Sequence, residues 1–82
     1  MDKRLGFIGV IVEDREHAVR EVNSLISLFA DSIIARTGVP YKEKDVSVIT
    51  LVIDMSTDQL GELTGRLGAV PGVSVKSGLS KR

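Results

Sequence analysis

Apolar and polar residues alternate with different periods along the chain, and each period predicts an element. Residues 5–12 are apolar throughout, and such a short run predicts a strand buried on both faces. Over residues 15–29 the period becomes helical, with Ala18 and Val22 on an apolar stripe and charged residues opposite. Asp14, between the two segments, is a suitable residue to cap this helix.

The middle of the chain reads as two further strands. Residues 32–39 form a short segment that Arg36 interrupts and Gly38 and Pro40 close, which is typical of an edge strand. After a charged turn, residues 46–55 carry the strongest β pattern of the chain. They are apolar on both faces, which predicts a central strand covered on two sides.

The last third predicts a second helix and a final strand. Ser56 and Gln59 have the spacing of a capping box, and leucines then follow at helical intervals. Pro71 and Gly72 fit the corners of a type II turn, and residues 73–79 follow as a strand.

The order strand-helix-strand-strand-helix-strand predicts a single α+β domain over residues 1–82. Two right-handed βαβ halves of this kind interleave into a four-stranded antiparallel sheet with both helices on one face, the ferredoxin-like fold. The opposite sheet face has nothing in the chain to cover it, although strands 5–12 and 46–55 are apolar there too. A bare apolar face of that size predicts an interface.

Three glycines of the second helix, Gly61, Gly65 and Gly68, share a stripe. They do not form a dinucleotide fingerprint, which needs glycines in the turn before a helix. Because a glycine inside a helix costs about 1 kcal/mol relative to Ala, we expect the stripe to allow close approach of a neighbouring helix. A ligand in that groove is the alternative.

The amino-acid composition limits the classes of partner that we expect. The chain has 82 residues, no Cys, and His17 as its only histidine, so disulfides and a structural metal site are not expected to support its small core. Self-association, as a dimer or tetramer through the open sheet face and edge strands, is the remaining expectation. With 11 basic and 11 acidic residues, no Trp and one Tyr, direct nucleic-acid binding is not expected, nor is a cofactor.

The N-terminal apolar run does not indicate export. It is too short to cross a bilayer, which takes about 20 apolar residues. Charged residues follow it directly, without a small-residue cleavage site. We therefore expect a cytoplasmic protein that does not bind membranes.

Few residues of the chain are candidates for catalysis or ligand binding. His17 is expected to be a solvent-exposed helical residue without the partners that a catalytic base needs, so no catalytic residue and no enzyme activity are predicted. The unusual stretch is residues 36–41, which can be read as edge protection followed by a turn. It can also be read as a subunit contact or an anion site with Arg36 as donor. The ligand or interface candidates are Arg36, Thr37, Gly38, Pro40 and Tyr41.

Four segments carry a resemblance to a known family in order and spacing, namely residues 12–15, 34–40, 63–68 and 71–76. Through them the chain resembles the small stand-alone regulators of the iron-only hydrogenase system. The resemblance implies the fold of the ACT domain and of the regulatory domain of the nickel-responsive repressor. That repressor's nickel site uses several His and a Cys, so nickel sensing by its mechanism is not expected here. Its DNA-binding ribbon-helix-helix segment is also absent, so regulation of DNA would have to act through a partner.

The resemblance leaves several functions open. The first is a regulatory or small-ligand-binding oligomer, acting on transcription or on assembly in an iron-only hydrogenase system. The alternatives are a small dimeric ferredoxin-like enzyme, such as an isomerase or oxygenase, and an interaction scaffold for hydrogenase maturation.

Overall fold

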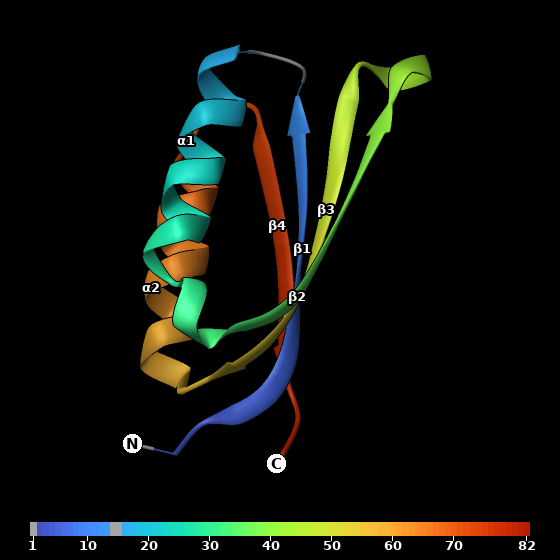
Figure 1. Ribbon diagram of the computed structural model, residues 1–82. Coiled ribbons are helices and arrows are strands. Elements are labelled where there is room, and N and C mark those ends of the chain that lie inside the picture. The colour runs from blue at the N-terminus through green and yellow to red at the C-terminus, as the bar shows by residue number, and fades with distance from the viewer. Residues whose placement is uncertain (1, 14–15) are drawn as a thin grey trace.

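A computed structural model describes residues 2–13 and 16–82, and its elements follow the predicted order (Figure 1). The predicted cap at Asp14 lies outside the described residues. The helices and strands are β1 (Arg4–Glu13), α1 (Glu16–Leu28), β2 (Ile33–Tyr41), β3 (Val46–Met55), α2 (Thr57–Gly68) and β4 (Val73–Leu79), with short 3-10 turns η1 (Ala30–Ser32) and η2 (Lys42–Lys44).

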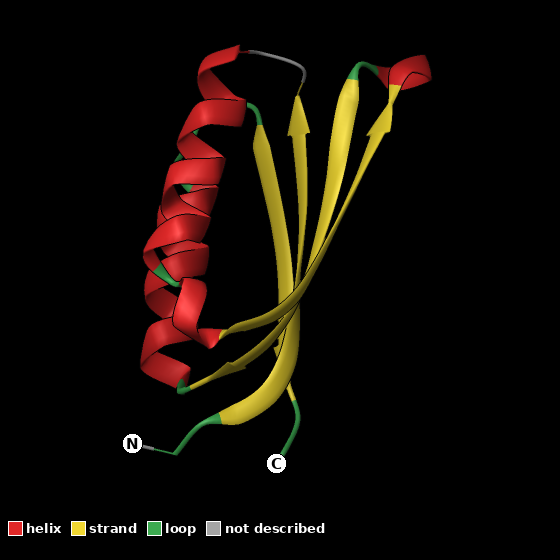
Figure 2. Ribbon diagram, in the orientation of Figure 1, coloured by secondary structure: helices red, strands yellow, loops and turns green. Residues whose placement is uncertain are grey.

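The four strands form one antiparallel sheet in the order β2-β3-β1-β4. Both helices lie on the same side of it, α1 beside α2, and the sheet twists away from them toward the β2–β3 end (Figure 2). The ferredoxin-like fold is therefore confirmed, with β1 and β3 in the centre and β2 at an edge.

The core lies between the helices and the inner sheet face. Alternate residues of β1 and β3 point inward, as the period of two along a strand requires. They meet the apolar stripes of α1 and α2. The buried side chains are Ile8, Val10, Val12, Ala18, Val22, Ile26, Ile49, Leu51, Ile53, Met55, Leu63, Leu67 and Val70.

One prediction about these strands is wrong for the single chain. The central strands are not covered on two sides, because both crossover helices pack on the same face of the sheet. Their other alternate residues remain on the surface, among them Phe7 (54% exposed) and Val52 (43% exposed).

Local signals fix the start of α2 and the turn that follows the helix, as predicted. The Ser56 hydroxyl accepts the Gln59 N–H at 3.2 Å, and the Gln59 side chain accepts the Ser56 N–H at 3.0 Å, which completes the capping box. After α2, Gly72 has φ 84°, a left-handed conformation that favours glycine.

Within this chain, the predicted role of the α2 glycines is wrong. A Cβ atom added at Gly61, Gly65 or Gly68 would meet nothing within 4 Å. Leu63 and Leu67 are buried, while the glycines lie on the opposite, exposed side of the helix. They therefore do not bring α2 close to another element of this chain.

Candidate functional site

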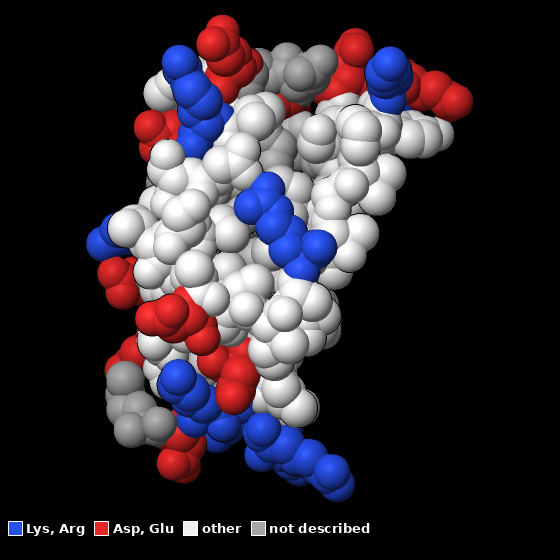
Figure 3. Space-filling model, in the orientation of Figure 1, with Lys and Arg blue, Asp and Glu red and all other residues white. Residues whose placement is uncertain are grey.

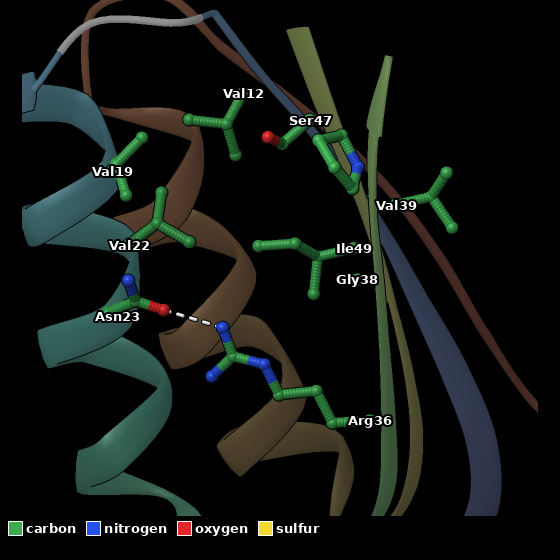
Figure 4. A pocket seen from close by; sticks show the side chains of 10 residues that line it. Val12, Val19, Val22, Asn23, Arg36, Gly38, Val39, Ser47 and Ile49 are labelled. Atoms are coloured by element: carbon green, nitrogen blue, oxygen red, sulfur yellow. Dashed lines mark hydrogen bonds between the residues drawn. The ribbon is translucent and has the colours of Figure 1, made fainter.

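A cavity opens where β2 extends beyond the cover of the helices. α1 and α2 pack on β1, β3 and β4, whereas β2 pairs only with β3 among the described strands and is exposed from Ile34 to Tyr41. The space between α1 and the β2–β3 pair is about 260 Å³ (Figure 4). Its lining residues are Val12, Val19, Val22, Asn23, Arg36, Gly38, Val39, Pro40, Ser47 and Ile49.

The register of β2 divides the five predicted candidates between two faces. Arg36, Gly38 and Pro40 lie opposite Leu51, Ile49 and Ser47 of β3 and border the cavity on the inner face. Thr37 and Tyr41 are the intervening residues and therefore belong to the outer face. The structure thus brings three of the candidates together and separates two from them.

Arg36 reaches across the cavity from β2 to α1. Its Nη2 donates to the Asn23 Oδ1 at 2.5 Å, a contact drawn in Figure 4. Within residues 2–13 and 16–82, no carboxylate forms an ion pair with this guanidinium. Arg36 therefore places a positive charge, held by a neutral amide, beside an apolar space.

Gly38 leaves the cavity wall open. A Cβ atom at Gly38 would meet nothing within 4 Å, although its partner in the register, Ile49, is buried. The neighbouring Val39 borders the cavity, but its side chain points to the other side of the sheet (Figure 4). The absence of a side chain at position 38 is thus one reason that the cavity exists.

The outer sheet face is the second feature. We call it the open sheet face and define it by its exposed apolar residues. The ring of Phe7 lies over Gly78 of β4, since a Cβ atom at Gly78 would be 3.0 Å from that ring. The residues of the open sheet face are Leu5, Phe7, Ile11, Val39, Tyr41 and Val52.

Thr37 and Tyr41 belong with this outer face rather than with the cavity. Thr37 pairs with Thr50 and is exposed. The Tyr41 hydroxyl donates to the Glu43 carboxylate at 3.0 Å beyond the strand end. Of the predicted candidates, these two can contribute to a subunit contact but not to the cavity.

Side chains for catalysis or metal binding do not gather in the described part of the chain. His17 is exposed and borders a shallow depression between α1 and α2, together with Glu21 and Arg66. No group of three or more His, Asp or Glu residues within the described ranges could hold a metal ion. The described helices also include none long and apolar enough to cross a membrane.

Sequence reasoning did not select the residues that complete the cavity. Asn23 follows Val22 on α1 and looks like an ordinary polar position beside an apolar stripe. Its contact with Arg36 joins two elements across the fold, which a linear pattern does not reveal. The apolar wall residues on α1, β1 and β3, which are Val12, Val19, Val22 and Ile49, carry only the signal of core positions.

The sequence and the fold together can be compared with known proteins. The family described as "Iron-only hydrogenase system regulator, putative" (TM1266-like) matches residues 4–77. The chain belongs to this family. Among curated proteins, no sequence matches the chain significantly.

Solved structures agree with membership of the iron-only hydrogenase system regulator family. TM1266 from Thermotoga maritima, described as an uncharacterized protein, has 40% identity, covers 98% of this chain and 100% of its own, and superposes with a TM-score of 0.95. The ACT domain of the GTP pyrophosphokinase from Chlorobium tepidum has 25% identity, coverages of 92% and 97%, and a TM-score of 0.77. The C-terminal domain of MgtC from Mycobacterium tuberculosis shares the fold at 19% identity, coverages of 99% and 92%, and a TM-score of 0.75.

Proposed function

We propose that this protein is a self-associating regulatory module of an iron-only hydrogenase system that acts in the cytoplasm and has no catalytic activity of its own. The observation that carries the proposal is the open sheet face. Apolar side chains from β1, β2 and β3 share that surface, and contiguous apolar patches on soluble proteins mark interaction sites.

A second copy of the chain is the partner that this surface fits best. The face carries an aromatic ring, Phe7, next to branched aliphatic residues, a composition suited to sheet-on-sheet packing. A domain of this size buries only about 60–65% of its unfolded surface, so a subunit interface would add apolar burial that the single chain lacks. Two copies would bury each other's open sheet face.

Regulation would act through protein contacts rather than by direct binding of nucleic acid. The net charge is zero, and Figure 3 shows acidic and basic atoms mixed at both ends of one face, with a group of basic atoms in its otherwise mostly uncharged middle. Such a surface offers no continuous basic track for phosphates. Control of transcription or of hydrogenase assembly therefore requires a further protein partner in this proposal.

The enzyme alternative has less support. A catalytic base must lie within hydrogen-bond reach of its substrate. The single histidine, His17, borders the depression between α1 and α2, whereas the cavity that Arg36 borders lies between α1 and β2. The lining of that cavity, with Arg36, Asn23 and Ser47 as its polar members, suits binding better than proton transfer.

Light scattering coupled to size exclusion tests the proposal at micromolar protein. We expect a mass of two or four chains, because exposed apolar faces of this kind associate in water. A homogeneous species of 8.9 kDa at all concentrations would contradict self-association. Affinity capture of the tagged chain from cells that contain an iron-only hydrogenase, followed by mass spectrometry, then tests whether a component of that system is bound.

A further inference from the structure

We propose that the cavity between α1 and β2 binds a compact monocarboxylic acid with a branched apolar body, and that Arg36 holds its carboxylate. This inference deepens the proposed function by naming the class of effector. The cavity is built from residues of one chain, so ligand binding can be tested separately from self-association.

The walls of the cavity favour an apolar ligand body. Val12 and Val22 are buried, Ile49 is 7% exposed, and Val19 is packed against the same cluster. Together with Pro40 they surround a space of about 260 Å³. This volume lies just below the range of about 300–1,000 Å³ that is common for ligand sites, so it suits a short branched chain better than a long or polycyclic one.

The charge at one end of the cavity favours an anion. In Figure 4 the Arg36 guanidinium lies beside the space that Val22 and Ile49 enclose, and its one drawn contact is to Asn23. A guanidinium has five N–H donors in a fixed planar array, which matches the two oxygens of a carboxylate. One donor is used by Asn23, and this bond orients the others.

The lining also indicates which carboxylic acids are preferred. An amino acid carries its ammonium next to its carboxylate, and therefore close to the Arg36 cation. No Asp or Glu is among the described residues that line the cavity to offset that repulsion. We therefore expect acids without an α-amino group to bind better than the corresponding amino acids.

Three ligands of the same carbon skeleton test this selectivity. Isocaproate has the branched body and the carboxylate, isocaproamide replaces the charge with an amide, and leucine adds the ammonium. We expect isocaproate to shift the amide resonances of residues on α1 and β2 in a two-dimensional NMR titration of the full chain. Isocaproamide and leucine should each bind at least about tenfold more weakly.

Two variants at the cavity and one control variant locate the binding site. Arg36→Gln removes the charge and should raise the Kd of isocaproate about tenfold or more. Arg20→Gln is the matched control, because Arg20 is an exposed arginine of α1 that pairs with Glu16 at 3.6 Å. This variant should bind isocaproate with the same Kd as the wild type. Gly38→Leu places a side chain in open space on the cavity wall and should abolish binding while the spectrum stays that of a folded domain.

The outcomes separate this inference from the proposed function. Equal binding of isocaproate and isocaproamide would overturn the anion site, and equal binding of leucine would overturn the expected class of acid. Shifts confined to the open sheet face, or no shifts at millimolar isocaproate, would overturn the cavity as the site. A monomeric chain that binds isocaproate with the expected selectivity would refute self-association and leave the inference intact.

Discussion

Gly6 and Gly9 of β1 meet different neighbours across the sheet. A Cβ atom at Gly6 would lie 2.3 Å from the carbonyl oxygen of Gly78, which is backbone and cannot rotate away. A Cβ atom at Gly9 would have only the Lys76 carbonyl oxygen nearby, at 3.8 Å, an ordinary contact. Glycine is therefore required at position 6 by close packing but not at position 9.

This contrast gives a prediction for a matched pair of variants. Gly6→Ala should lower the free energy of unfolding by about 1–3 kcal/mol, the usual cost of overpacking. Gly9→Ala should leave it unchanged or raise it by about 0.5–1 kcal/mol, since alanine restricts the unfolded chain. Urea unfolding at one fixed protein concentration measures both, and similar losses for the two variants would contradict the packing described.

The sequence predicts some residues of the cavity but not others. The sequence points to Arg36 because a charge inside an apolar edge strand is unusual. Thr37 and Tyr41 were grouped with it because they are near in sequence, yet strand alternation places them on the other face. Asn23 could not be paired with Arg36, because their contact depends on how α1 lies against β2.

At the scale of elements, α2 shows both a correct and a wrong prediction from the same sequence. The capping box was predicted because it depends on residues three apart. The glycine stripe was misassigned because its spacing shows that the glycines share a side of the helix but not which side. Leu63 and Leu67 define the buried side, and the glycines lie opposite.

The exposed position of these glycines has a measurable consequence. Gly61→Ala and Gly65→Ala should each raise the free energy of unfolding by about 0.5–1 kcal/mol, because alanine favours the helix and nothing obstructs its Cβ. Thermal and urea unfolding would report the gain. Gly72→Ala is the contrasting control and should destabilise, since φ is 84° there and the Glu13 side chain lies 2.8 Å from the added atom.

If a partner packs on the glycine side of α2, the same alanine variants would behave differently. They would then weaken association while the helix gained propensity. Light scattering of Gly61→Ala and Gly65→Ala beside the wild type distinguishes the two cases, and we expect no change in mass.

At the scale of the whole molecule, the fold could be predicted because each element has a clear period, and the order of elements leaves few topologies. The strand boundaries of β3 and β4 match the predicted ranges 46–55 and 73–79. The two-sided apolar pattern of the central strands also indicated a bare face. What covers that face is not encoded in any local pattern, so the oligomeric state stays a prediction.

A charge in the middle of the open sheet face tests that prediction directly. Val52→Lys should reduce the mass in light scattering to that of one chain, because a lysine ammonium would lose its hydration in a dry interface. The inward face of β3 is untouched, so the domain should remain folded by circular dichroism. Leu28→Lys, at a 68% exposed position of α1, is the matched control and should leave the mass unchanged.

The alternation of side chains along β2 has a consequence for thermodynamic linkage. Arg36 and Gly38 border the cavity, while Val39 and Tyr41, on the same strand, belong to the open sheet face. A carboxylic acid that displaces β2 on binding would therefore change the fit between subunits as well. Thermodynamic linkage then makes the effect reciprocal. If the acid changes the affinity between subunits by some factor, assembly changes the affinity for the acid by the same factor. The concentration of the protein would in that case set the concentration of acid to which it responds.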